Sequence, residues 1–418
     1  MKIAVIGGGL AGLTTAWLLG RQQHQVTLYE RHARPGFVAS SMAVPWRGQE
    51  VAVDVPLRVF YAGYYPSLTR LYRELGVPTE AVSYATSFMG EERRLFFRWR
   101  NLRLGSRSYA YVLPHDVLGG RARRIVGDVL RFYRQAPAAL LRGELAALSI
   151  GDYVVAQAYS ADFIDGFLLP AISTICTCNY AAACAVPAAV IVDYMARGLT
   201  HEPVRRAVHG ADDAAQKLLA GVHQLRCDTP ITSVRRTAAA VHVHTSGGVE
   251  ALFDHVVLAT QSNQSRSLLA DATPAEAAVL GAFRYQTVDV VMHRDATLMP
   301  LRRADWSPVN ALVAPGSEHP MSTIWVNAVQ PALRDAPPVF QTVHPLRQPA
   351  QELIIGRARF ERPLVDAQSA AALQGLVSLH AERGRRLWLC GAYAQPGIPL
   401  LESAVASAYV VASAIGPG

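Results

Sequence analysis

The sequence is poor in charged residues. Asp, Glu, Lys and Arg make up only 17% of its 418 residues, whereas hydrophobic residues make up 51% and the mean hydropathy is +0.15. A chain of this composition can bury a large apolar interior, which excludes an intrinsically disordered protein. Because one compact core seldom serves more than about 200 residues, the length indicates two or three lobes.

Cysteine is also scarce and irregularly placed. The five cysteines form no C-x-x-C pair and no Cys/His spacing of a zinc site, and their number is odd. We therefore expect no metal site, and a reduced, cytoplasmic environment. Residues 1–6 run directly into a glycine-rich turn, without the basic and apolar regions of a secretory signal.

The chain shows no internal repeat, no low-complexity tract and no nucleic-acid-binding motif. One stretch without charge, residues 166–192, is compatible with a membrane span by length alone. Two prolines, an asparagine and several Ser and Thr residues interrupt it, and basic anchors are absent from its flanks. This pattern favours buried helices that line an apolar pocket, in which Cys176 and Cys178 pack as small hydrophobic groups.

A nucleotide-binding pattern occupies the N-terminus. Residues 3–6 form a short apolar run typical of a buried parallel strand. The next residues, Gly7-Gly8-Gly9-Leu10-Ala11-Gly12, fit G-x-G-x-x-G and lead into a helix expected over 13–19. A second strand is expected over 25–30 and ends in Glu30. The order and spacing of these elements favour a dinucleotide site over a glycine turn used only for packing.

Each residue of this pattern has a physical task. Gly7 would permit the tight turn, Gly9 would let the backbone approach a pyrophosphate, and Gly12 would let the helix pack closely on the sheet. The phosphates would lie at the helix N-terminus, and the Glu30 carboxylate would accept hydrogen bonds from the adenosine ribose. An acid at this place argues against NADP but leaves NAD and FAD open.

The C-terminus carries a second strand-turn-helix unit. A buried strand is expected over 385–391, a Pro/Gly turn over 395–399, and an alanine-rich helix over 401–415. Between the ends, strands are expected in the nucleotide lobe at 231–234, 241–244 and 255–260, with Gly247-Gly248 as a hairpin turn.

Taken together, the sequence resembles the flavin amine oxidase and phytoene desaturase superfamily, and more closely the bacterial proteins described as NAD/FAD-binding and amine-oxidase-like. The resemblance covers nearly the whole chain. It is carried by Gly7, Gly9, Gly12 and Glu30, by residues 53–60, 65–68 and 74–77, and by residues 256–260, 292–295, 298–300, 325–327, Gln330 and 390–393.

The resemblance implies an α/β fold in two parts. A discontinuous Rossmann-like FAD-binding domain would comprise residues 1–85, 203–280 and 385–418. An α+β substrate-binding domain with a helical cap would comprise residues 86–202 and 281–384.

The resemblance also implies non-covalent FAD. Ile231 would hold adenine through main-chain atoms, and Gly391 would lie beside the pyrophosphate and ribityl chain. Backbone N–H groups at Leu401 would face the flavin, where a helix N-terminus stabilises negative charge on the reduced ring. The cofactor-binding residues expected by position are Gly7, Gly9, Leu10, Ala11, Gly12, Glu30, Arg31, Ile231, Thr260, Gly391, Leu401 and Glu402.

The chain departs from the superfamily near the flavin. Gly36-Phe37 stands where a second glycine after the acid is usual, and Pro56 stands two residues after the Val53-Asp54 pair, where glycine is usual. The loop 397–403 differs from the usual Gly-Phe-His-Glu-Asp-Gly type of sequence. Lysine, which amine oxidases of the superfamily often place near the flavin, occurs only at Lys2 and Lys217, and neither matches the expected strand.

Three polar residues are positional candidates for catalysis, namely His293, Arg58 and Asn327. Each has a structural alternative: a satisfied core histidine, an arginine that pairs with Asp54 or a FAD phosphate, and an asparagine at a strand end. Tyr61, Tyr64 and Trp325 are expected either to line the substrate pocket or to pack in the core.

The activity implied is FAD-dependent removal of a hydride equivalent from a C–N or C–C unit of a mainly apolar small molecule. The alternatives are a desaturase or isomerase of a polyene or lipid-like chain, and a flavin-binding accessory protein without turnover.

The net charge of +8 is concentrated in one segment. Residues 91–144 contain twelve arginines against five acidic residues, with aromatic residues between them. This segment is either a solvated helical face or a docking site for an anionic partner such as a carrier protein, a membrane surface or an acidic substrate.

Overall fold

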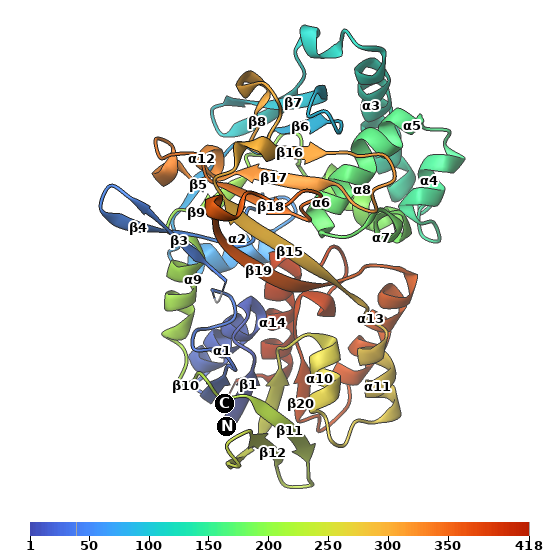
Figure 1. Cartoon of the computed structure of the whole chain (residues 1–418). Helices are drawn as coiled ribbons and strands as arrows, with labels where there is room; N and C mark the ends of the chain where they lie inside the picture. The colour runs from blue at the N-terminus through green and yellow to red at the C-terminus, as the bar shows by residue number, and fades with distance from the viewer. Residues whose placement is uncertain (39, 418) are drawn as a thin grey trace.

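A five-stranded parallel sheet forms the lower part of the molecule in the computed structural model, which describes residues 1–38 and 40–417 (Figure 1). The strand order is β10 (Gln224–Arg226), β2 (Gln25–Tyr29), β1 (Lys2–Ile6), β14 (His255–Leu258) and β20 (Leu387–Leu389). The apolar runs of β1, β14 and β20 are almost wholly buried, as central parallel strands require. The strands expected at the N-terminus, at 255–260 and at the C-terminus are confirmed.

Helices pack beside this sheet. α1 (Leu10–Arg21) contacts α14 (Leu401–Ile415) and α9 (Gly210–Leu219). α14 begins and ends at the residues predicted from the sequence. The chain ends lie close together, since the Met1 amino group is 3.5 Å from Nδ1 of His24 and the His24 Nε2 is 2.8 Å from the carbonyl oxygen of Gly416.

A small antiparallel sheet extends from the parallel one. Its strands, in order, are β11 (Ile231–Arg236), β12 (Val241–Thr245) and β13 (Glu250–Phe253). Gly248, with φ +76°, lies in the β12–β13 turn, as the glycine pair predicted.

An eight-stranded mixed sheet occupies the upper part of Figure 1. Every neighbouring pair is antiparallel except β16 and β6. Its strands, in order, are β19 (Ile354–Pro363), β15 (Tyr285–His293), β18 (Phe340–Val343), β17 (Met321–Trp325), β16 (Val309–Leu312), β6 (Thr86–Met89), β7 (Leu95–Leu104) and β8 (Arg107–Tyr111).

Helices cluster at one end of this sheet (Figure 1). They are α3 (Gly120–Leu141), α4 (Ile150–Ala156), α5 (Ala161–Phe163), a π-helical turn (Ile164–Leu168), α6 (Leu169–Cys176), α7 (Tyr180–Ala185) and α8 (Ala188–Ala196). The uncharged stretch 166–192 therefore forms several short helices. No helix among residues 1–38 and 40–417 is long and apolar enough to cross a membrane.

The chain passes between the lower and upper parts at several places. β5 (Thr79–Ala81) pairs with β9 (Arg205–Ala207), so the chain leaves and returns at one place. The hairpin of β3 (Met42–Trp46) and β4 (Gln49–Val53) packs with Val288 and Val290 of β15. The remaining helices are α2 (Pro66–Glu74), α10 (Ser262–Leu268), α11 (Pro274–Gly281), α12 (Val326–Val329) and α13 (Ala367–His380).

The predicted α/β fold class is confirmed, since a Rossmann-like parallel sheet adjoins a mixed sheet with helices at its end. The domain boundaries stay a prediction.

Candidate functional site

The glycine loop joins β1 to α1. Gly7 has φ +108°, a conformation that residues with a Cβ rarely adopt. A Cβ on Gly12 would lie 1.9 Å from the Gly7 carbonyl oxygen, so the close packing of helix and loop requires glycine there. A Cβ on Gly9 would meet no atom within 4 Å. The loop therefore leaves open room at Gly9, while Leu10 and Ala11 are buried in the first turn of α1.

Three strand ends converge beside this loop. A Cβ on Gly7 would lie 3.2 Å from Cγ2 of Thr260, and a Cβ on Gly391 would lie 3.6 Å from the Thr260 carbonyl oxygen. β1, β14 and β20 are parallel neighbours, so the residues that follow them meet at one edge of the sheet. Ligands of open α/β sheets bind at this edge.

Glu30 anchors the loop from the end of β2. Its Oε2 accepts the N–H groups of Gly8 at 2.9 Å and Gly36 at 3.1 Å, and its Oε1 accepts that of His32 at 3.0 Å. A carboxylate offers about four acceptor sites, so one is left for a ribose hydroxyl. Arg31 is exposed and donates to Nε2 of His32 at 3.2 Å.

Ile231 begins β11 and is half-buried. The N–H of nearby Thr229 donates to the Glu30 carbonyl at 2.9 Å, so the start of β11 lies next to Glu30. This position is the one expected for a main-chain contact with adenine.

Leu401 starts α14, but its neighbour Glu402 is engaged elsewhere. The two carboxylate oxygens of Glu402 accept the N–H groups of Ser67 and Leu68, each at 3.0 Å. These N–H groups belong to the first turn of α2, where the helix itself offers them no acceptor. Glu402 therefore caps a neighbouring helix.

His293 and Asn327 have their polar atoms occupied by protein partners. The His293 Nε2 lies 2.7 Å from Oγ1 of Thr342, its Nδ1 accepts the Asp295 N–H at 3.1 Å, and burial lowers its pKa to about 4. The Asn327 amide donates to carbonyls of the 333–337 loop and its oxygen accepts the Val339 N–H at 2.8 Å. A catalytic role for either stays a prediction, and this placement favours the structural alternative.

Arg58 is the catalytic candidate that keeps a free donor. Its Nη2 donates to the Phe37 carbonyl at 2.5 Å, and its guanidinium lies 4.1 Å from the centre of the Phe37 ring. Its Nε is buried and has no hydrogen-bond partner in the part of the chain that the structure describes. The Phe37 N–H donates to the Gly8 carbonyl at 3.0 Å, which places Arg58 beside the glycine loop. Burial lowers the pKa of Arg58, although Asp54 nearby opposes this effect.

A second partly buried arginine, Arg362, was missed from the sequence. It is the next-to-last residue of β19 and its Nε donates to Oγ1 of Thr177 at 3.2 Å. Burial together with nearby Arg58 lowers its pKa. The alternation of β19 carries the signal, because Arg357, Arg359 and Glu361 are exposed whereas Arg362 lies on the other face.

The three aromatic candidates lie in two different clusters. Tyr61 and Tyr64 are buried with ring centres 6.3 Å apart, and the Tyr64 hydroxyl accepts the Ile398 N–H at 2.9 Å. Burial raises the pKa of Tyr64 to about 12. Trp325 packs instead on Trp306, with ring centres 5.6 Å apart. A pocket role stays a prediction for all three.

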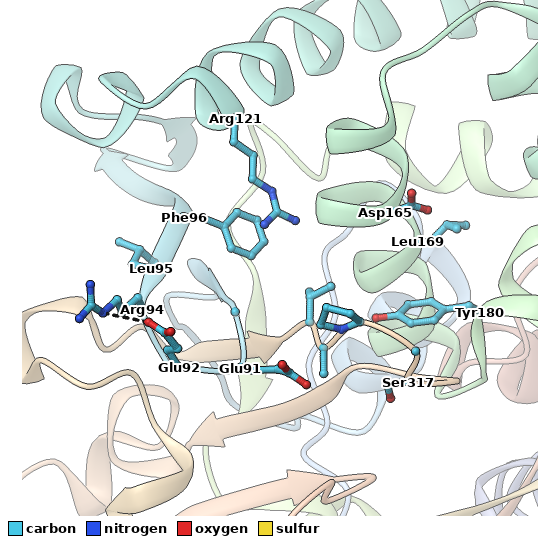
Figure 2. A pocket seen from close by; sticks show the side chains of 15 residues that line it. Glu91, Glu92, Arg94, Leu95, Phe96, Arg121, Asp165, Leu169, Tyr180 and Ser317 are labelled. Carbon is cyan, nitrogen blue, oxygen red and sulfur yellow. Dashed lines mark ion pairs between the residues drawn. The ribbon is translucent and has the colours of Figure 1, made fainter.

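A cavity of about 740 Å³ lies in the upper part of the molecule, lined by the loops 90–94 and 313–317 and by residues of β7, α3, α6 and α7. Figure 2 shows the Arg121 guanidinium above the Phe96 ring, at 3.5 Å from its centre, with Asp165 and Tyr180 from the helices opposite. Its size suits a small molecule. Its lining includes none of the residues predicted for cofactor, catalysis or substrate.

The arginine-rich segment is largely neutralised within the protein. Seven of its twelve arginines lie within ion-pair distance of a carboxylate, at Arg94, Arg98, Arg100, Arg121, Arg124, Arg131 and Arg142. Arg103, Arg107, Arg123 and Arg134 are exposed without such a partner among the described residues. An anionic partner stays a prediction, and it rests on these four side chains.

The site fits a dinucleotide on two observations. Gly9 leaves space for phosphates at the N-terminus of α1, and the orphaned Arg58 Nε supplies a cation beside it. Main-chain atoms at Ile231, where β11 begins, and the Glu30 carboxylate would hold the adenosine part of the dinucleotide.

Comparisons with known proteins agree with this placement. Residues 5–75 match the model of the family described as NAD(P)-binding Rossmann-like domain. The zeta-carotene desaturase of Zea mays is 40% identical over 76 residues, which are 18% of this chain and 13% of that protein. That of Solanum lycopersicum is also 40% identical over 76 residues, which are 12% of its length. The match thus spans about an eighth of these curated relatives.

Solved structures share the fold over the whole chain. The fatty acid isomerase from P. acnes has a TM-score of 0.66 at 15% identity and covers 98% of this chain and 97% of its own. Cyclohexylamine oxidase from Brevibacterium oxydans IH-35A has a TM-score of 0.66 at 12% identity and covers 99% and 98%. These likenesses agree with the resemblance to the flavin amine oxidase and desaturase superfamily, since residues 5–75 match the Rossmann-like model and the solved structures share the fold. The closer likeness to bacterial amine-oxidase-like proteins stays a prediction.

Proposed function

We propose that the chain binds FAD non-covalently and is an FAD-dependent oxidase or dehydrogenase. It would remove a hydride equivalent from a C–N or C–C unit of a mainly apolar small molecule. The observation that carries the proposal is the convergence of Gly7, Gly9, Thr260 and Gly391 at one edge of the parallel sheet, with open room at Gly9.

Bound flavin would supply the hydride acceptor, which is why the protein needs no acid–base pair of its own. The tasks left to the chain are to hold the substrate, to exclude water and to stabilise charge. Thr260 and Gly391 border the proposed dinucleotide site. No side chain of the described residues caps the N-terminus of α14 at Leu401, so its N–H groups could face the place where negative charge would develop.

Arg58 is assigned here to the dinucleotide phosphates. Its guanidinium lies beside the glycine loop, and its Nε has no partner among the described residues. An anion there would satisfy this buried donor, whose desolvation is otherwise uncompensated. The assignment is the FAD-phosphate alternative already open from the sequence.

A second candidate function is a desaturase or isomerase of a polyene or lipid-like chain. The uncharged helices α6 and α7 and the mainly apolar helix α8 favour it, because they bring apolar side chains to the end of the eight-stranded sheet. The likeness to zeta-carotene desaturases and to a fatty acid isomerase supports the same candidate.

A cytoplasmic location is proposed because all five cysteines are free thiols.

The test begins with cofactor binding. Purified protein incubated with FAD and desalted is expected to keep one flavin per chain, seen as a visible absorbance band. Protein that emerges colourless would contradict the proposal. Anaerobic mixing of the flavin-loaded protein with primary amines and with unsaturated fatty acids then separates the candidates, since bleaching by amines supports the oxidase. Double-bond migration or new double bonds in the lipid products would favour the second candidate.

A further inference from the structure

A cluster of three metal-binding side chains lies on the small antiparallel sheet. Along β12, Val241 and Val243 are buried and pack in the core, whereas His242 and His244 lie on the opposite face. This alternation follows from the two-residue period of a strand. Glu250 of β13 pairs directly with His244 across the ladder, so its side chain reaches the same face.

The three side chains converge on one point. One ligand atom from each of His242, His244 and Glu250 lies within 4.8 Å of the other two. The Nδ1 of His242 is 2.5 Å and the Nε2 of His244 is 3.4 Å from Oε1 of Glu250. The 3.4 Å separation matches that between neighbouring ligands of a single first-row metal ion, which binds each ligand at about 2.0–2.2 Å. The 2.5 Å contact is a hydrogen bond, which a bound ion would replace after a small movement of these partly exposed side chains.

The chemistry of the cluster selects the kind of ion. Two imidazoles and one carboxylate are the ligand set of zinc, copper and nickel, whereas magnesium and calcium prefer oxygen alone. All three side chains are partly exposed, at 28%, 41% and 48%, so an ion could enter from solvent.

One charge opposes an ion at this place. Arg235 of β11 pairs with His242 across the ladder and is exposed. Its long side chain can extend into solvent, where the interaction with an ion is screened. The carboxylate of Glu250 lies on the other side of the histidines and favours a cation.

We propose that His242, His244 and Glu250 form a surface site for one divalent transition-metal ion, with zinc as the reference ion and its remaining coordination positions open to water. The site clamps β12 to β13. It is distinct from the dinucleotide site, although β11 of the same sheet begins at Ile231.

The consequence for the molecule is thermodynamic. An ion that binds the folded chain and not the unfolded one raises the free energy of unfolding by RT ln(1 + [M]/Kd). Zinc is therefore expected to raise the melting temperature of the full-length protein, and a chelator is expected to reverse this change.

The experiment is a calorimetric titration of zinc into metal-stripped, full-length protein, with and without FAD. The expected result is one zinc ion per chain. The double variant His242→Gln/His244→Gln is expected to lose this binding, and Glu250→Gln to weaken it at least about tenfold, or about 1.4 kcal/mol. The matched control His223→Gln removes an exposed histidine outside the cluster and is expected to bind zinc as the parent does.

Two further readouts make the outcome decisive. Cobalt in place of zinc is expected to give visible absorption that the double variant lacks, and magnesium is expected to give no binding. Far-ultraviolet circular dichroism is expected to be unchanged in the variants, because all three side chains are partly exposed. Zinc binding that survives in the folded double variant, or no stoichiometric binding by the parent, would overturn the proposal. The result does not depend on flavin, so its failure would leave the proposed function standing.

Discussion

Two glycines of one loop are held by different constraints. A Cβ on Gly12 would collide with the Gly7 carbonyl at 1.9 Å, whereas a Cβ on Gly9 would enter open space. Gly12→Ala is therefore expected to lower the free energy of unfolding by about 3 kcal/mol, since the helix must move away from the loop. Gly9→Ala is expected to leave stability unchanged and to weaken FAD binding, because its methyl group occupies the space proposed for the phosphates.

Urea unfolding and fluorescence titration with FAD separate these effects. Normal FAD affinity in a folded Gly9→Ala protein would show that the phosphates do not pass this position. Normal stability of Gly12→Ala would show that α1 can shift at little cost.

The buried His293 makes stability depend on pH. Its pKa is about 4 in the folded protein against 6.5 for a free histidine, so the unfolded chain binds more protons between these values. The contribution of His293 to the free energy of unfolding is therefore complete above pH 6.5. It is lost as the pH drops toward 4, which lowers the free energy of unfolding by on the order of 3 kcal/mol.

His293→Gln is expected to flatten the dependence over this interval, as measured by urea unfolding at several pH values. The amide of Gln can still bond to Thr342 but cannot be protonated. A slope equal to that of the parent would assign the acid sensitivity to other groups, among which His344 and His380 also have pKa values lowered to about 4 by burial.

At the scale of elements, α14 and α2 are joined by one carboxylate. Glu402 accepts hydrogen bonds from two N–H groups in the first turn of α2. Its carboxylate stabilises that helix N-terminus both by accepting these bonds and through its negative charge. Glu402→Ala is expected to cost about 1 kcal/mol of stability, the usual price of a lost cap. Glu402→Gln keeps one acceptor and is expected to cost less.

The same variants examine the cofactor role that position alone gave to Glu402. If this side chain only caps α2, FAD affinity is expected to stay within a factor of two of the parent. A large loss of FAD affinity with unchanged stability would instead assign Glu402 to the cofactor.

At the scale of the whole molecule, four arginines of the segment 91–144 are exposed and have no carboxylate partner among the described residues. They are Arg103, Arg107, Arg123 and Arg134. If this segment docks an anionic membrane surface, sedimentation with phosphatidylglycerol vesicles is expected to fall as salt rises from low to physiological concentration. Reversing all four charges to Glu is expected to abolish it. Reversal of four exposed arginines elsewhere that also lack a carboxylate partner among the described residues, Arg73, Arg266, Arg334 and Arg383, is the matched control. Equal loss in both variants would reduce the effect to net charge.

Much of the nucleotide-binding part could be predicted because its information is local. Gly7, Gly9, Gly12 and Glu30 lie within one strand-turn-helix-strand unit, and the hydrophobic periods of β1, β14 and α14 mark buried strands and a packed helix directly. Glycine identity, strand alternation and chain order were sufficient there.

The candidates that depended on long-range contacts were harder. Whether His293 and Asn327 have free atoms is decided by Thr342 and by the 333–337 loop, which no local pattern links to them. Arg362 reaches Thr177 across 185 residues. His242, His244 and Glu250 match no zinc spacing of the common kinds, because the third ligand comes from the register of β12 with β13.

The sequence by itself determined the α/β class, the dinucleotide loop and the final helix, since backbone conformation and burial at these places follow from neighbouring residues. Only the tertiary structure decided which polar groups remain unpaired. The Arg58 Nε has no partner among the described residues beside the glycine loop, whereas both carboxylate oxygens of Glu402 accept hydrogen bonds from α2. The reason is physical: a buried polar atom is available for chemistry only when no other part of the chain has already satisfied it.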